Sequence, residues 1–326
     1  MSQGKESARK EIEILRILSE FDSPVGSTLL KRELRKRGFL LSERTVRYHL
    51  LLLEAKGFVL GHNRRGRTIT SKGIEELSRV LASQRLCFTT TRFMSLAYSA
   101  TYDPAKDSGT VVANVSILDK RLFDKTLETM DALQKMGLLS APYIKVLDEN
   151  EEYCNISVPE GNIALFTVCN LTIDSILIHS GIPLFLGCGG LVQMVNNKPI
   201  RFAEIVSYKG TTLPPLEVFV YKKMTSIKRI LKTGSGMLLA TLREIPAEAR
   251  EKTVKILEKQ KEKGWRGILV LGESHEPILG VPVGMDRFGI CMVGGIIPAA
   301  AMAEEGTQIL TSASHCFIPI EEMTRI

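Results

Sequence analysis

Arginines are the side chains in this sequence best suited to bind an anionic partner. In the stretch 61–70, GHNRRGRTIT, three arginines surround Gly66 between the apolar run 58–60 and the strand-like run 68–70. A basic tip between two such runs predicts a β-hairpin that reaches a phosphate backbone or the minor groove. The candidate contact residues in this tip are Arg64, Arg65 and Arg67.

A second set of candidate contacts lies on the helix expected just before this hairpin. Ser42 can cap a helix of about residues 43–56, which ends at Gly57. Residues 50–53 are apolar all round and must pack on two sides, whereas the first half of the helix stays polar, as in a helix that enters the major groove of DNA. The candidate DNA contacts on this helix are Arg44, Thr45, Arg47 and Tyr48.

The surrounding elements follow the order of a winged helix. Helices are expected at about 8–21 and 28–37, and Thr70 can cap a further helix after the hairpin. Residues 1–85 hold 18 Lys and Arg against 10 Asp and Glu, whereas the remaining residues hold 25 against 26. Arginines in a turn are often only solvated, and winged helices also dock proteins or bind RNA. The concentration of positive charge in this first part nevertheless favours DNA binding.

Composition narrows the class of protein. The chain has 326 residues, 44% of them hydrophobic, which predicts two or three globular domains. No apolar run approaches the ~18 residues of a membrane span, and the N-terminus lacks the apolar segment of a signal peptide. Six cysteines are scattered without a C-x-x-C pair, at positions 87, 154, 169, 188, 291 and 316. They indicate a cytoplasmic protein without disulfides or a zinc module.

The rest of the chain contains an internal repeat of the order strand, helix, strand. Gly137 and Gly264 end the two helices at an offset of 127 residues. The first copy comprises residues 111–118, about 120–136 and 143–147, and the second comprises 237–245, about 247–263 and 267–271.

A second pair of stretches predicts how the repeat continues. GIPLFLGCGGL (181–191) and GVPVGMDRFGI (280–290) both fit G-[IV]-P-[VL]-x5-G-[LI], at an offset of 99. The smaller offset predicts about 28 extra residues in the first copy, near 148–180. We therefore expect an α/β fold in which two related halves form either two lobes or one shared sheet, with a crevice between them.

No reaction is indicated by this region. It has no P-loop and no H-E-x-x-H, and residues 187–190 lack the spacing of a dinucleotide-binding motif. Residues 273–276, ESHE, could form a metal cluster or a catalytic pair, but short polar loops of this kind usually face solvent. We therefore expect a protein that is not an enzyme and holds neither a metal nor a cofactor.

Three stretches carry donors that suit a small anionic ligand. Residues 167–174 lead from a strand into a helix of about 171–180, where amides attract anions. Residues 198–217 and 242–245 each supply an arginine, and the second of these lies at the carboxyl end of a strand, where open α/β sheets bind ligands. Two guanidinium groups suit a dicarboxylate, although either arginine alone could equally form a surface ion pair. The candidate ligand contacts are Cys169, Asn170, Thr172, Arg201, Ser207, Thr211 and Arg243.

Several long motifs resemble the NrpR domain, the effector domain of an archaeal family of nitrogen-regulatory repressors. The leading winged helix resembles the DNA-binding module of the same family. The likeness covers most of the chain. The similar stretches are YSATYDP…GTVVANVSIL (98–118), LFTVCNLTIDSILIHSGIPL (165–184), GGLVQMVNNKPIRFAEIVSYKGTTLPPLEVF (189–219), GSGMLLATLREIPA (234–247) and GVPVGMDRFGICMVGGIIP (280–298).

The resemblance implies a transcriptional repressor of nitrogen-assimilation genes that binds palindromic operators in double-stranded DNA as a homodimer. The family is similar in sensing 2-oxoglutarate and releasing DNA in response, and a companion NrpR-domain protein joins in members of the split type, which this chain resembles. The expected domains are residues 1–84 and 85–326. The second domain should contain related halves at about 105–220 and 232–326.

The chain departs from the family pattern at three places. Asn170-Leu171 and Asp174-Ser175 stand where small residues or glycine are expected, and the stretch 185–188 replaces a more polar one. These departures concern effector binding more than the fold. Two other interpretations stay open: a winged-helix regulator of another small anionic metabolite, and a small-molecule enzyme with an appended nucleic-acid module.

Overall fold

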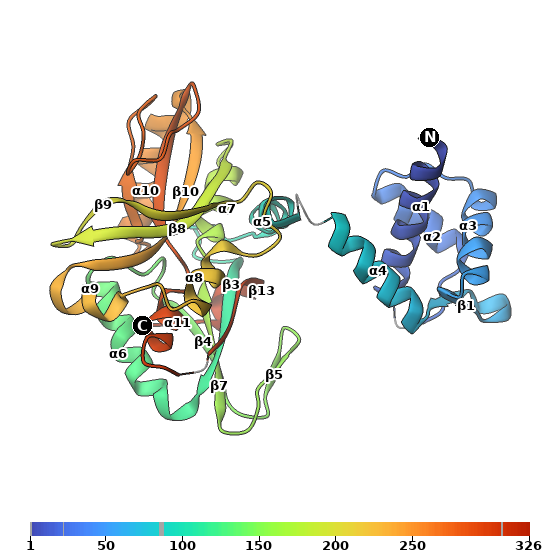
Figure 1. The fold of residues 1–326 in the computed structure, drawn as a ribbon, viewed down its shortest axis with the longest axis horizontal. Coiled ribbons are helices and arrows are strands. Elements are labelled where there is room, and N and C mark those ends of the chain that lie inside the picture. The colour runs from blue at the N-terminus through green and yellow to red at the C-terminus, as the bar shows by residue number, and fades with distance from the viewer. Residues whose placement is uncertain (1, 22, 85–87, 308) are drawn as a thin grey trace. The chain divides into compact units, whose positions relative to one another are not determined.

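The computed structural model describes residues 2–21, 23–84, 88–307 and 309–326. The chain forms two compact units, residues 1–85 and 86–326 (Figure 1). Both helices and sheets are present, which confirms the predicted α/β class with a winged helix ahead of it. Within the described residues, no helix is long and apolar enough to cross a membrane.

The first unit has the predicted order of three helices followed by a hairpin. Leu34 of the second helix and Val46 and Leu50 of the third are buried in one apolar core with the first helix. The Oγ of Ser42 accepts a hydrogen bond from the amide of Thr45, which confirms the predicted N-cap of the third helix. The elements of this unit are α1 (Ser2–Leu18), α2 (Ser27–Lys36), α3 (Glu43–Ala55), β1 (Val59–Gly61), β2 (Arg67–Ile69) and α4 (Ser71–Gln84).

The hairpin of β1 and β2 forms the wing and is fixed to the rest of the unit. Its strands pair antiparallel, and a 3₁₀ turn of Asn63–Arg65 joins them. Val25 and Arg67 exchange two backbone hydrogen bonds, at 2.9 and 3.0 Å. Gly66 has a φ of +117°, and a Cβ there would lie 2.5 Å from the backbone of Val25. Glycine is therefore required where the wing passes Val25.

The second unit consists of two five-stranded sheets with helices packed on them, and every strand pair in these sheets is antiparallel. The expectation that ligands bind at the carboxyl edge of a parallel sheet therefore does not apply here. The elements before residue 235 are α5 (Phe88–Ser99), β3 (Thr110–Asp119), α6 (Phe123–Lys135), β4 (Tyr143–Leu147), β5 (Glu152–Tyr153), β6 (Ile156–Ser157), β7 (Asn162–Val168), α7 (Leu171–His179), β8 (Phe185–Val195), β9 (Lys198–Ser207), α8 (Pro215–Tyr221) and α9 (Ile227–Thr233). The later elements are β10 (Gly236–Pro246), α10 (Arg250–Glu262), β11 (Ile268–Leu271), β12 (Arg287–Val293), α11 (Ile297–Ala303), β13 (Leu310–Pro319) and β14 (Thr324–Arg325).

Each sheet contains two strands from the other half of the repeat. The strand orders are β13-β3-β7-β4-β14 and β11-β12-β10-β8-β9. The run β3, α6, β4, β7, α7, β8 corresponds to β10, α10, β11, β12, α11, β13. Yet β8 pairs with β10, and β13 pairs with β3, so the two halves exchange their last strands. The predicted alternatives of two lobes or one shared sheet are both wrong, because this exchange interlocks two sheets.

The stretches 181–191 and 280–290 are not equivalent parts of the repeat, so the prediction of about 28 extra residues in the first copy is wrong. α7 begins at Leu171 and α11 at Ile297, which keeps the offset near that of the first pair of helices. The stretch 181–191 leads into β8, whereas 280–290 leads into β12, the counterpart of β7. Their sequences agree because both begin with a glycine at positive φ and continue into a strand.

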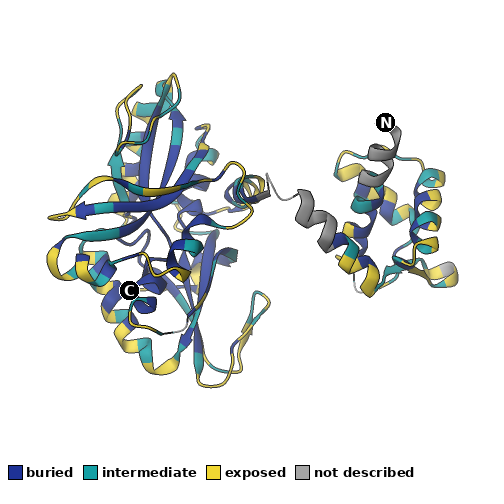
Figure 2. Ribbon diagram, viewed as in Figure 1, coloured by how far each residue is buried: buried dark blue, intermediate teal, exposed yellow. Residues whose placement is uncertain are grey.

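The helices α7 and α11 are buried inside the second unit (Figure 2). All residues of α11 and residues 171–177 of α7 are buried. Each helix follows a strand of one sheet and leads into the strand that is exchanged to the other. The starts of these two helices therefore lie where the two sheets meet.

Gly190 is expected to be required for the pairing of β8 with β9. A Cβ at Gly190 would lie 2.1 Å from the carbonyl oxygen of Glu204 on β9. Because the backbone would have to move, Gly190→Ala should lower the free energy of unfolding by about 2 kcal/mol in urea denaturation. Val195→Ala, at an exposed position of the same strand, should change it by less than about 0.5 kcal/mol. Equal stabilities of the two variants would contradict this packing.

Candidate functional site

The N-terminal half of α3 presents the predicted DNA contacts at the surface. Arg44 and Arg47 are exposed, and Tyr48 has 58% of its surface exposed although it is aromatic. Thr45 lies at the start of the helix, with its Oγ1 2.8 Å from the Oγ of Ser42. An exposed aromatic ring beside two arginines at this end of the helix is typical of a surface that reads DNA.

Arg47 is oriented by neighbouring polar groups. Its Nη2 forms an ion pair with Oε1 of Glu43, and its Nε donates to the Oγ of Ser27 at 3.2 Å. Hydrogen bonds from Ser27 and Arg47 lower the pKa of Glu43. Arg47 must therefore exchange Glu43 for a phosphate or a base when it contacts DNA.

The arginines of the wing divide into two kinds. Arg65 is exposed at the tip. Arg67 instead turns toward α3, where its Nε and Nη2 donate to Oε2 of Glu54 at 3.1 and 2.9 Å. The guanidinium of Arg67 therefore joins the wing to α3, and its contact with DNA stays a prediction. The side chain of Arg64 lies outside the described residues.

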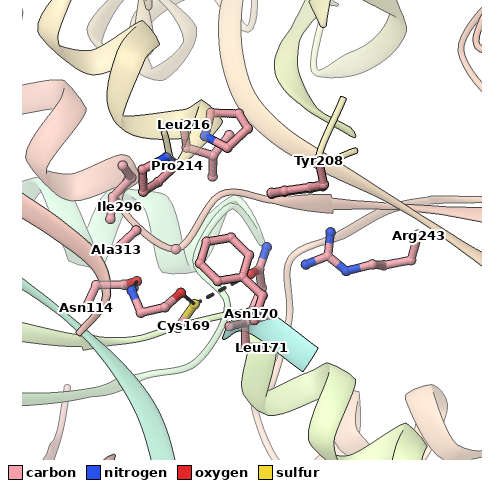
Figure 3. Close-up of a pocket in the computed structure, with 14 residues that line it drawn as sticks. Asn114, Cys169, Asn170, Leu171, Tyr208, Pro214, Leu216, Arg243, Ile296 and Ala313 are labelled. Atoms are coloured by element: carbon pink, nitrogen blue, oxygen red, sulfur yellow. Dashed lines mark hydrogen bonds between the residues drawn. The ribbon is translucent and has the colours of Figure 1, made fainter. Parts of the chain in front are cut away.

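In the second unit, a small cavity lies where the two sheets meet the starts of α7 and α11 (Figure 3). Its volume is about 20 Å³, which is room for about one water molecule. Sites for small ligands are usually larger than about 300 Å³, so this pocket is closed. Its polar lining residues come from both halves of the repeat and are Asn114, Cys169, Asn170, Tyr208, Arg243 and Ser314.

A buried ion pair stands beside this pocket. Nε of Arg243 donates to Oδ2 of Asp174 at 2.9 Å, and these side chains are 1% and 0% exposed. The guanidinium also lies 5.5 Å from the centre of the Tyr208 ring. Within the described part of the chain, Oδ1 of Asp174 has no hydrogen-bond partner. Burial raises the pKa of Asp174 despite the neighbouring guanidinium, and burial raises the pKa of Tyr208 to about 12.

Cys169 and Asn170 form the wall of the pocket at the link from β7 to α7. Nδ2 of Asn170 donates to Oγ1 of Thr241 at 2.9 Å and to the carbonyl of Val293 at 3.2 Å, which ties the first half to the second. The Sγ of Cys169 lies 3.3 Å from the Oγ of Ser314. Burial raises the pKa of the Cys169 thiol, so this sulfur packs and hydrogen-bonds rather than acting as a nucleophile.

Arg201 does not join Arg243 at this pocket. It is exposed on β9, and its Nε donates to Oε1 of Gln193 at 3.0 Å. On β8, Gln193 lies opposite Arg201 and Leu186 lies opposite Arg243. Seven residues of extended strand span about 23 Å, so the two arginines cannot grip one small ligand. The predicted pairing of these guanidinium groups is wrong.

Three further predicted ligand contacts do not line the pocket either. The Oγ1 of Thr172 accepts a hydrogen bond from the amide of Val112 and fastens α7 to β3. Ser207 is exposed at the end of β9, and its Oγ accepts a hydrogen bond from the amide of Lys209. The Oγ1 of Thr211 is used within its own loop, with Leu213. These hydroxyl groups stabilise local structure.

Four residues at the site are not among the ligand contacts predicted from the sequence: Asn114, Asp174, Tyr208 and Ser314. Asp174 is the single carboxylate in the largely apolar helix segment LTIDSILIH, a pattern that indicates a buried partner. Tyr208 comes from the loop after β9 and reaches Arg243 only through the fold. Ser314 has a φ of +53° in a bulge of β13, where its amide donates to Oδ1 of Asn114 at 3.0 Å. No local pattern predicts that bulge.

Comparisons with known proteins establish the family. The family model described as NrpR regulatory domains NRD1 and 2 matches residues 86–325. The chain belongs to the NrpR family. A second model, described as the ribonuclease R winged-helix domain, matches residues 12–77.

Full-length NrpR relatives support this assignment. The global nitrogen regulator NrpRI of Methanosarcina mazei is 37% identical over 318 residues, which cover 98% of each chain. The global nitrogen regulator NrpR of Methanocaldococcus jannaschii is 32% identical over 319 residues, and the chain spans 55% of that relative. The crystal structure of a nitrogen repressor-like protein from Methanococcus jannaschii matches 73% of this chain and 97% of its own, with a TM-score of 0.62 and 26% identity. With its N-terminal winged helix, the chain is a nitrogen-related transcriptional regulator.

The residues ESHE at 273–276 are not arranged as a metal-binding cluster in the described structure. Among the described residues, no group of three or more His, Cys, Asp or Glu could hold a metal ion. Nε of Arg250 donates to the carbonyl of Gly272 at 3.2 Å, and its Nη2 forms an ion pair with Glu273 at 2.6 Å. This loop is therefore held by surface contacts.

The two wing arginines of this NrpR-family protein should respond differently to substitution. Arg65→Ala should weaken binding to all DNA sequences about equally and lower the slope of log affinity against log salt by about one. Arg67→Ala should mainly lower the stability of the winged helix, by up to about 1 kcal/mol, because Glu54 loses its partner. Mobility shifts at several salt concentrations and thermal unfolding measure both effects. The assignment fails if Arg67→Ala lowers the salt slope without changing stability.

Removing one partner of the buried pair should destabilise the regulatory unit. Arg243→Met leaves Asp174 uncompensated and should lower the free energy of unfolding by about 3 kcal/mol. A lone buried carboxyl binds its proton more tightly in the folded than in the unfolded state. The difference in the free energy of unfolding between the wild type and Arg243→Met should therefore become smaller as the pH falls from about 8 to about 5.

The double variant Arg243→Met, Asp174→Asn is the control for this prediction. It should recover part of the lost stability and should not depend on pH in this way. Urea denaturation at several pH values checks both variants. A deficit that is constant with pH in Arg243→Met would contradict the burial of an unpaired carboxylate.

Proposed function

We propose that this protein is a repressor of nitrogen-assimilation genes, and that it binds palindromic operators as a homodimer and is released from them by 2-oxoglutarate. The observation that carries this proposal is Arg243, a fully buried arginine beside a closed cavity shared by both halves of the regulatory unit. The names of the relatives support the nitrogen-related role. The effector, the homodimer and a companion NrpR-domain protein are carried over from the family resemblance, and a cytoplasmic location is proposed from the scattered cysteines.

The chemistry of the pocket suits a carboxylate. A guanidinium donates two parallel hydrogen bonds to a carboxylate, and such charge-assisted bonds are stronger than neutral ones. Burial keeps the hydroxyl of Tyr208 protonated at neutral pH, so it can donate as well. The amide of Asn170 adds a neutral donor at the pocket wall once it leaves Thr241. The pocket must open to admit the ligand, because its present volume is about 20 Å³.

A larger groove is less suited to a dianion. It surrounds Trp265, has a volume of about 550 Å³ and is open to solvent. Its cations, Lys261 and Arg266, are exposed. Water screens charges at such a surface, so they contribute little to affinity. We therefore place the effector at Arg243.

Opening of the pocket can act on DNA binding through the arrangement of the homodimer. Two recognition helices read adjacent major grooves when they lie about 34 Å apart. The ligand can shift the equilibrium only by binding one arrangement more tightly than the other. Asn170 and the Arg243–Asp174 pair each join the two halves. A ligand that replaces these contacts therefore favours a different position of one sheet relative to the other.

A mobility shift with DNA from upstream of nitrogen-assimilation genes tests this function. The wild-type chain should bind and should be released by 2-oxoglutarate at up to millimolar concentration. Arg243→Lys keeps the positive charge but cannot bind both Asp174 and a carboxylate in the same way. It should bind DNA normally and need about 10- to 100-fold more ligand for release.

Variants outside the pocket serve as controls. Arg201→Ala and Arg266→Ala should be released at the wild-type ligand concentration, because these residues lie away from Arg243. Loss of the response in Arg266→Ala alone would move the effector to the open groove. Release by another small anion and not by 2-oxoglutarate would support a different metabolite as effector.

A further inference from the structure

The buried charges at the pocket, one positive on Arg243 and one negative on Asp174, cancel each other, and a bound dianion would add two negative charges. Asp174 and Arg243 form a pair whose members are 0% and 1% exposed, so the empty site is neutral overall. A fully ionised dicarboxylate that entered it would leave two uncompensated negative charges away from water. Uncompensated buried charge is avoided in proteins by a change of protonation or by movement into solvent.

Asp174 depends on a single cation. Its Oδ2 accepts from Nε of Arg243, whereas its Oδ1 has no hydrogen-bond partner among the described residues. A ligand carboxylate that binds the guanidinium competes for the same donors. It also brings a like charge next to Asp174, and a like charge favours the protonated carboxyl. Both effects favour the protonated form of Asp174.

The other titratable groups around the pair stay uncharged at neutral pH. In the described part of the chain, those that act on Asp174 or on Arg243 are Tyr208, Cys169 and Cys188. Burial raises the pKa of Tyr208 to about 12 and that of Cys188 to about 11, and burial also raises the pKa of Cys169. Asp174 is therefore the group among them that can change its charge.

We infer that a dianionic effector binds this pocket together with one proton, which is taken from solvent onto the carboxylate of Asp174. This inference rests on the proposed function, because it requires the effector to bind at Arg243. Before binding, the site contains one positive and one negative charge, and the ligand brings two negative charges. After binding, Asp174 is neutral and Arg243 faces the ligand, so the net charge of the complex is −1 instead of −2. Asp174 thus makes effector binding sensitive to pH.

The sign of the pH dependence follows from the proton count. The complex holds one more proton than the free protein and free ligand, so affinity rises as pH falls. The association constant should change by up to about tenfold per pH unit while Asp174 is ionised in the free protein.

Titration calorimetry of the full chain with 2-oxoglutarate measures this proton directly. At a fixed pH in phosphate, imidazole and Tris buffers, the slope of binding enthalpy against buffer ionisation enthalpy gives the protons taken up per site. We expect a value close to one for the wild type. Asp174→Asn imitates the protonated carboxyl, so it should take up none and bind with an affinity that does not vary with pH.

Glu244→Gln is the matched control. Glu244 is the next residue on β10 and forms an ion pair with Arg287 at 3.1 Å, apart from the pocket. This variant should take up the same number of protons as the wild type. Binding by the wild type without proton uptake would overturn the inference and leave the proposed function intact, since the ligand would then have displaced Asp174 without protonating it. No binding of 2-oxoglutarate would overturn both.

Discussion

The buried ion pair between Arg243 and Asp174 is the interaction on which the arrangement of the regulatory unit depends. It joins α7 of the first half to β10 of the second, where the two sheets meet. Neither charge can be left alone in this interior without a cost of several kcal/mol. A ligand that binds one partner must therefore provide for the other.

The exchange of strands explains how a change at this pair can reach the whole unit. Because β8 completes the sheet of β10 and β13 completes the sheet of β3, neither half can move as a separate lobe. Asn170 bridges the halves at the wall of the pocket, and the Oγ of Ser314, in the bulge of β13, lies 3.3 Å from the Sγ of the neighbouring Cys169. A ligand that opened the pocket would therefore act on both sheets at once, as the proposed release from DNA requires.

Much of the fold could be predicted from the sequence, whereas the site could be predicted only in part. Helical spacing and Ser42 as a cap predicted α3, and Gly137 and Gly264 revealed the repeat, because these signals are local. The exchange of strands depends on which distant strands pair, and the hydrophobic pattern within each strand does not predict this pairing. Cys169 and Asn170 were found because they link a strand to a helix, and Arg243 was found because the sequence placed it near the end of a strand, although β10 continues to Pro246. Arg201 was wrongly grouped with Arg243 because similar local patterns surround the two arginines. Their partners on β8, Gln193 and Leu186, are separated by about 23 Å of strand.

The central claim is that the effector binds at the junction of the two sheets and opens it there. Hydrogen–deuterium exchange of the full chain with and without 2-oxoglutarate tests this claim most directly. Our account predicts that the ligand changes the protection of amides in residues 169–175 and 312–316, while the amides of the groove around Trp265 keep their protection. A change confined to that groove, or saturating ligand without any change at the junction, would contradict it.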